Sequence, residues 1–309
     1  MKKLNGFAPD NTPRGAATSA FIEHVEKKSN GRLKIETFPM EMYGTESTII
    51  QAVQTGTLDM QIVGANILAN TIPQFAALSL PLLTQSIDEG CAVLDGPAGN
   101  RLQELGEEHG FKVLADVALG YAQITNNVRP INSPDDLLGM KMRSPDEYSF
   151  IETFKALGAS VTTLDYTKLY TSLAEGVIDG QFNPLFNIFD LNIDDVQDYL
   201  AMTNHTYYVA FIIMNKNVFD GLAPELQQII LEAGNKARHA ARKYVGDHEK
   251  DLLEKAKRSF KEITYPEMKP FQKKIQPVYA KMEEVIGAEI VHTIQEFLTV
   301  YRREKAVSV

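Results

Sequence analysis

The first third of the chain alternates between strand and helix patterns, and this order constrains the fold more than any other feature. Residues 2–8 predict a strand, and a turn at 10–13 opens a helix with apolar residues four apart that ends at Asn30-Gly31. The following segments predict a strand at 33–38, a helix at 45–55 and a strand at 58–63. This βαβαβ order predicts a mostly parallel sheet with helices on both faces, in which ligands bind beyond the carboxyl ends of the strands.

The rest of the chain predicts a second α/β unit and a long helix. Asp165 is expected to cap a helix that Gly176 ends, and 207–215 is a strongly apolar strand. An amphipathic run from Pro224 to Phe260 exceeds the usual length of a globular helix. Further elements are expected as strands at 113–118, 123–125, 140–143, 177–181 and 262–265, and as helices at 271–286 and 288–302.

Charge and composition exclude several classes of function. At 309 residues the chain is long enough for two lobes, and its net charge of −9 argues against nucleic acid as a partner. The single cysteine, Cys91, excludes an internal disulfide framework. No run approaches the roughly 18 apolar residues of a membrane span. Residues 1–6 show no apolar signal-peptide core, so we expect either a cytoplasmic protein or a periplasmic one whose signal peptide is absent from this sequence.

No motif for catalysis or for a cofactor is found. The six histidines form no HxH or HxxxH pair, and the glycine-rich nucleotide loops and the Gly-x-Ser-x-Gly elbow are missing. The paired carboxylates at 135–136 and 194–195 are expected to cap helices. We therefore predict no metal and no cofactor. A cytoplasmic α/β enzyme stays as an alternative of another class, although it would need an acid/base pair that the sequence does not offer.

Two motifs indicate a site for a small organic anion. Arg143 ends a short strand, where a guanidinium suits bidentate capture of a carboxylate. Asn183, in the sequence Asp-Gly-Gln-Phe-Asn-Pro, would add a hydrogen bond from a second strand end. Taken alone, each residue is also compatible with an ordinary surface arginine or a turn asparagine.

The order of short motifs along the chain resembles the extracytoplasmic solute-binding proteins of TRAP transporters, the DctP family. The motifs are 29–33 (SNGRL), 43–44 (YG), 54–59 (QTGTLD), 80–81 (LP), 129–131 (RPI), 136–143 (DLLGMKMR), 169–173 (LYTSL) and 176–180 (GVIDG). The resemblance implies a two-lobed, periplasmic-binding-protein-like α/β fold with a long helix that spans both lobes. We expect lobe I in residues 1–124 plus 206–250, and lobe II in 125–205 plus 251–309.

The resemblance also implies a function. Such proteins capture an organic acid in the periplasm and deliver it to a TRAP membrane permease, without chemistry. The family arginine that pairs with the ligand carboxylate corresponds to Arg143, and the family asparagine corresponds to Asn183. We expect a monomer, with a dimer as the alternative. A stand-alone sensor that docks to a receptor fits the same sequence.

Departures from the sialic-acid-binding branch suggest the kind of acid. Gln123 replaces a second arginine, Phe182 a glutamate, Gly64 an acidic residue and Phe7 a polar one. The residues that we expect to contact the ligand are Arg143, Asn183, Tyr166, Phe182, Phe7, Glu46, Gln123 and Tyr208. Because pockets match the polarity of their ligands, we predict a monocarboxylate with an aromatic or apolar tail, such as an aryl or indole oxo, hydroxy or amino acid. The alternative is a small aliphatic acid, a C4-dicarboxylate or a sugar acid.

Overall fold

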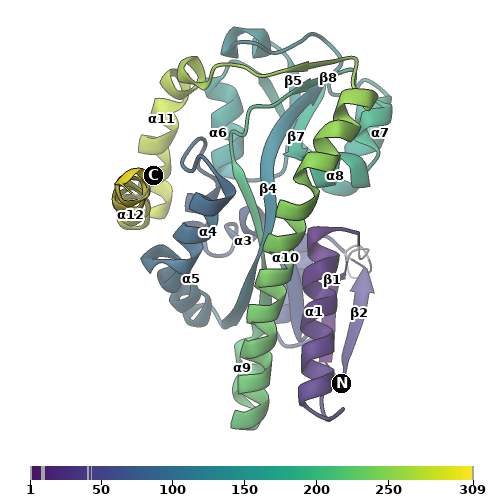
Figure 1. Ribbon diagram of the computed structural model, residues 1–309, viewed down its shortest axis with the longest axis vertical. Coiled ribbons are helices and arrows are strands. Elements are labelled where there is room, and N and C mark those ends of the chain that lie inside the picture. The colour runs from purple at the N-terminus through teal and green to yellow at the C-terminus, as the bar shows by residue number, and fades with distance from the viewer. Residues whose placement is uncertain (1, 8–10, 40–41, 43, 308–309) are drawn as a thin grey trace. The chain divides into compact units, whose positions relative to one another are not determined.

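The computed structural model describes residues 2–7, 11–39, 42 and 44–307. The chain forms two compact units, each built from three separate segments (Figure 1). Unit 1 contains residues 1–72, 98–119 and 209–247, and unit 2 contains 73–97, 120–208 and 248–309. Ala8, Asp10 and Tyr43, which belong to predicted elements or motifs, lie outside the described residues.

Unit 1 has the βαβαβ order that the sequence predicts. β1 (Lys2–Phe7) lies between β2 (Ile35–Pro39) and β3 (Met60–Gly64) and pairs in parallel with both. β3 pairs on its other side, antiparallel, with β9 (Tyr207–Asn215). The helices of this unit are α1 (Pro13–Lys28), α2 (Glu46–Gln54), α3 (Ala65–Leu68), α5 (Pro97–Glu108) and α9 (Lys216–Asp220).

The strand order of unit 2 differs from the order along the chain. β4 (Phe111–Asn126) pairs antiparallel with β7 (Gly180–Pro184), which is followed in the sheet by β5 (Lys141–Ser144) and β6 (Ser160–Thr163) in parallel. A short β8 (Tyr199–Ala201) pairs with β4 and with β10 (Glu262–Thr264). The helices are α4 (Ile87–Asp95), α6 (Tyr148–Ala156), α7 (Leu169–Ala174), α8 (Leu185–Asp190), α11 (Met268–Ile286) and α12 (Ala288–Val307), with short 3₁₀ turns η2 (Pro73–Ser79), η3 (Pro134–Leu137), η4 (Tyr166–Lys168) and η5 (Ile193–Asp195).

The predicted long helix is α10 (Pro224–Ser259), and it contributes residues to both units (Figure 1). Residues 111–119 of β4 belong to unit 1. There α10 packs close to this part of β4, because a Cβ on Gly234 would come within 2.2 Å of the Leu114 carbonyl oxygen. Two arginines of α10, Arg238 and Arg242, form ion pairs with the buried carboxylate of Asp116 on β4. Within the described residues, no helix is long and apolar enough to cross a membrane.

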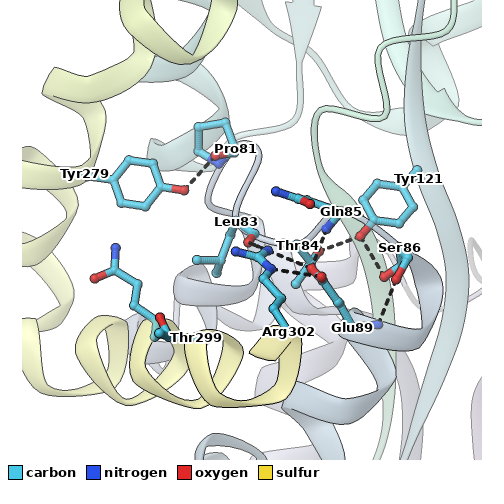
Figure 2. Close-up of polar contacts among 11 residues, drawn as sticks. Pro81, Leu83, Thr84, Gln85, Ser86, Glu89, Tyr121, Tyr279, Thr299 and Arg302 are labelled. Carbon is cyan, nitrogen blue, oxygen red and sulfur yellow. Dashed lines mark hydrogen bonds and ion pairs between the residues drawn. The ribbon is translucent and has the colours of Figure 1, made fainter. Parts of the chain in front are cut away.

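The segment 73–97 belongs to unit 2, whereas the predicted lobe I includes it. The reason is a set of contacts between this segment and the C-terminal helices (Figure 2). Arg302 of α12 donates through Nε and Nη2 to the two carboxylate oxygens of Glu89 at 2.9 and 2.7 Å, and also to the Leu83 carbonyl oxygen. Tyr279 of α11 donates to the Pro81 carbonyl oxygen at 2.8 Å. These contacts join residues that lie about 200 positions apart in the sequence, beyond the reach of local pattern analysis.

Candidate functional site

Arg143 lies near the carboxyl end of β5, as the sequence predicts. Its guanidinium is buried and hydrogen-bonded within the protein, unlike that of an exposed surface arginine. The residue is only 3% exposed. Its Nε and Nη2 both donate to the carbonyl oxygen of Leu164, at 2.9 and 2.7 Å. Leu164 directly follows β6, the parallel neighbour of β5. Since a guanidinium is planar and rigid, two bonds to one oxygen fix its orientation.

Asn183 lies on β7, on the same face of the unit 2 sheet as Arg143. The parallel register places Met142 beside Gly180, so Arg143 lies beside Gln181. Asn183 is two residues further along, and its antiparallel neighbour on β4 is Gln123. Side chains two positions apart on a strand share a face. The sheet therefore brings Arg143, Gln181, Asn183 and Gln123 together on one polar face.

Gln123 uses its amide within the protein. Its Oε1 accepts a hydrogen bond from the Asn204 backbone N–H at 3.0 Å, and its Nε2 donates to the side chain of Asn204 and to the Tyr121 carbonyl oxygen. Only 3% of Gln123 is exposed. It holds the turn at Asn204, whose φ of 45° lies in the left-handed region.

Phe182, which we expect to contact the apolar tail of the ligand, lies on the opposite face of β7 from Arg143 and Asn183. It is completely buried and stacks on Phe154 of α6, with a centroid distance of 4.5 Å. Phe150 and His205 contact it edge-on. The physical reason is strand alternation, because the residue between Gln181 and Asn183 must face the other side of the sheet.

The two tyrosines occupy different surroundings. Tyr208 stacks on Phe150 at 5.4 Å and belongs to the same aromatic cluster as Phe182. Tyr166 begins η4, two residues after Leu164, and packs half-buried against an apolar cluster that includes Leu169 and Phe189. Arg143 thus fixes the start of the turn that carries Tyr166.

The unit 1 candidates lie at the ends of elements. Phe7 is the last residue of β1, Glu46 is the first of α2, and Gly64 ends β3. The side chains of Phe7 and Glu46 lie outside the part of the chain that the structure describes.

The sequence did not indicate the roles of several buried polar residues of unit 2. Thr125, Gln181 and Gln197 are each at most 4% exposed and hydrogen-bond to one another. Glu147 caps α6 and accepts from the backbone N–H groups of Ser149 and Phe150; burial raises the pKa of its carboxyl to about 7, although these two bonds act in the opposite direction. A usable signal was present for Gln181, since it is two residues before Asn183.

Known proteins share this architecture over nearly the whole chain. Residues 4–285 match the family model described as bacterial extracellular solute-binding protein, family 7, DctP. The chain belongs to this family. A solute-binding protein of Verminephrobacter eiseniae is 31% identical over 294 residues, which cover 95% of this chain and 88% of the relative. The 2,3-diketo-L-gulonate-binding periplasmic protein of Escherichia coli is 31% identical over 247 residues, 80% of this chain and 75% of the relative.

Solved structures of the family agree with the fold. A TRAP periplasmic solute-binding protein from Polaromonas sp. JS666, bound to D-erythronate, matches with a TM-score of 0.90 and 29% identity, over 95% of this chain and 97% of the other. The predicted α/β fold class, two-lobed with a long helix, is thereby confirmed, as is the predicted membership of the DctP family.

Proposed function

We propose that this protein binds a small organic acid through its carboxylate in the periplasm and delivers it to a TRAP permease, without catalysing a reaction. The observation that carries the proposal is Arg143. Its buried guanidinium is oriented by Leu164 near the carboxyl end of a parallel strand, on the same sheet face as the amide of Asn183. In α/β sheets this edge is where ligands bind. A fixed guanidinium also loses little conformational entropy when it pairs with a carboxylate.

The ligand that we favour is a monocarboxylate with an aromatic or apolar tail. A neutral amide, Gln123, stands where a second arginine would serve a second anionic group, and it is engaged with Asn204. Gly64 offers no side chain for a polar tail. Tyr166 lies in the turn whose start Arg143 fixes, and we propose that it stacks on an aromatic ring of the ligand. A stacked pair of rings contributes about 0.5–1.5 kcal/mol beyond area burial.

A sugar acid is the second candidate. The polar face around Arg143 carries several amides, among them Gln181 and Asn183, which suit ligand hydroxyl groups. The Escherichia coli relative is named for 2,3-diketo-L-gulonate, and the Polaromonas protein holds D-erythronate.

A thermal-shift screen discriminates the two. The panel contains phenyllactate, phenylpyruvate, indole-3-acetate, D-erythronate and succinate. Stabilisation by the aromatic acids alone supports the favoured ligand class, and stabilisation by D-erythronate alone replaces it with the second candidate. The chain contains no tryptophan. Indole emission from the purified protein that is lost on unfolding and dialysis would therefore identify a co-purified indole acid.

The carboxylate contact is tested by substitution of Arg143. We expect Arg143→Ala to weaken binding of the best acid by about 2–5 kcal/mol, because it removes a buried charged partner. Arg143→Lys should also bind poorly, since an ammonium cannot reproduce the planar fork. Arg129→Ala, at an exposed site in the same unit, is the control. Calorimetry that gives the same affinity for Arg143→Ala and Arg129→Ala would remove Arg143 from the site.

A further inference from the structure

Five polar side chains of unit 2 form one continuous hydrogen-bonded chain that includes Asn183. Its members come from the loop after η5, from β4, from β7 and from α8; in order they are Gln197, Thr125, Gln181, Asn183 and Asn187. Thr125 and Gln181 are completely buried, and Asn183 and Gln197 are 3% and 4% exposed. Buried polar groups are costly unless each finds a partner, so the bonds of this chain have to be mutually consistent.

Two backbone carbonyls at the Gln197 end set the donor-to-acceptor direction of these hydrogen bonds. Nε2 of Gln197 donates to the carbonyl oxygens of Asp179 and Val196, at 3.4 and 3.2 Å. A carbonyl oxygen can only accept, so the amide nitrogen of Gln197 must face these two groups. Its Oε1 is then turned toward Thr125, whose hydroxyl donates to it at 3.0 Å.

Each following bond is determined by the one before it. Because the Thr125 hydroxyl spends its single proton on Gln197, its oxygen must accept from the next residue, Gln181, whose Nε2 lies 2.9 Å away. Oε1 of Gln181 consequently faces Asn183 and accepts from its Nδ2 at 2.6 Å. Oδ1 of Asn183 then accepts from Nδ2 of Asn187 at 3.4 Å.

We propose that Thr125, Gln181 and Gln197 are positioning residues that fix which atom of the Asn183 amide is donor and which is acceptor toward a bound acid. An asparagine amide has two N–H groups and two acceptor sites, and the hydrogen bonds to Gln181 and Asn187 use one of each. The second N–H and the second acceptor site then have fixed directions. The orientation follows from the chain itself; its role in recognising an acid rests on the function proposed above.

The consequence for the ligand is selectivity at the atom beside the carboxylate. A 2-oxo group only accepts hydrogen bonds, whereas a 2-hydroxyl group both donates and accepts. An amide fixed with its oxygen toward this atom can bond only the hydroxyl group, and one fixed with its N–H toward it can bond either, whereas an amide that is free to turn over adapts to both. Positioning of Asn183 therefore predicts a fixed preference between an oxo acid and the matching hydroxy acid.

The direct test is nuclear magnetic resonance of the Asn183 side-chain amide in the unliganded protein. Thr125→Val keeps the shape of the side chain but can neither donate nor accept, and Thr125→Ser keeps the hydroxyl. We expect Thr125→Val to shift the Asn183 amide resonances and to speed their exchange with water about fivefold to tenfold, as loss of a hydrogen bond implies. Thr125→Ser should match the wild type. An unchanged Asn183 amide in Thr125→Val would overturn the proposal.

A wild-type measurement serves if Thr125→Val fails to fold. The proposal requires that the Thr125 hydroxyl proton exchanges slowly with water and shows a nuclear Overhauser effect to the side-chain amide protons of Gln181. A Thr125 hydroxyl that exchanges as fast as that of an exposed threonine would contradict it.

The recognition step is tested by the affinity ratio of phenylpyruvate to phenyllactate in the same variants. Thr125→Val should change this ratio by about tenfold, which is the upper end of the effect of one altered hydrogen bond. Thr125→Ser should keep the ratio of the wild type. A lower melting temperature with an unchanged ratio would mean that Thr125 is structural only. If neither acid binds the wild type, the proposed ligand class fails, while the amide spectra still decide the orientation of Asn183.

Discussion

Removing the guanidinium of Arg302 should destabilise unit 2, because the carboxylate of Glu89 would remain buried without its cation. Figure 2 shows how Arg302 meets both carboxylate oxygens of Glu89. The Glu89 side chain is 10% exposed and that of Arg302 is 38% exposed. Breaking a fully buried pair costs about 3–5 kcal/mol, and an exposed pair contributes at most about 1. For this intermediate case we expect Arg302→Met to lower the free energy of unfolding by about 2 kcal/mol.

The assay is urea denaturation, with Arg303→Met as the matched control. Arg303 is the next residue of α12, and it is exposed. Its substitution should change stability by less than about 0.5 kcal/mol. A double-mutant cycle with Glu89→Gln separates the pair from the lost packing of the arginine stem. Equal stabilities for Arg302→Met and Arg303→Met would refute the reasoning.

The pH dependence gives a second check on the same pair. Burial raises the pKa of Glu89, but the hydrogen bonds from Arg302 and from the Gln85 backbone outweigh it, so that the pKa lies below the ordinary value of 4.5. A lowered pKa in the folded state means that the stabilisation is present above pH 4.5 and is lost as the pH falls through the folded-state pKa. The difference between the wild type and Arg302→Met should therefore be largest near neutral pH and shrink on acidification.

Two further substitutions test other features. Phe182→Ala should cost about 3–5 kcal/mol of stability while leaving carboxylate affinity nearly unchanged, and strong loss of binding without loss of stability would return Phe182 to the ligand site. Gly6→Ala should lower the free energy of unfolding by more than about 2 kcal/mol, because φ is +92° and the new Cβ would lie 2.6 Å from the Ile62 carbonyl oxygen. Gly110→Ala is the control, since φ is +83° but no atom of the described residues lies near the new Cβ, and it should cost about 1 kcal/mol. Similar costs for the two variants in urea denaturation would contradict the steric argument.

Much of the fold could be predicted because its signals are local. The apolar run at 207–215 coincides with β9, and the helix after Pro224 is α10. β4 was predicted as two strands because Gly120, with φ +93°, interrupts its pattern. β6 was missed since it is mostly exposed and rich in hydroxyl residues, so it lacks an apolar face.

The candidate site was less accessible to sequence reasoning. That Arg143 and Asn183 share a face depends on β7 lying beside β5, an order that no local pattern encodes. The orientation of Phe182 could have been predicted, since alternation along β7 requires that it face away from Asn183. The roles of Gln123 and Thr125 depend on partners more than 70 residues away in the sequence.

The pairing of β3 with β9 sets an order of events during synthesis. β3 ends at Gly64, whereas β9 begins at Tyr207, so the ribosome must make the whole stretch between them before that edge of the sheet can be covered. Until then the nascent chain presents an apolar strand with unpaired backbone groups, which is prone to join other chains. Native pairing has to wait for the C-terminal part of the chain, so a nascent chain stalled before Tyr207 is the species that we expect to need a chaperone.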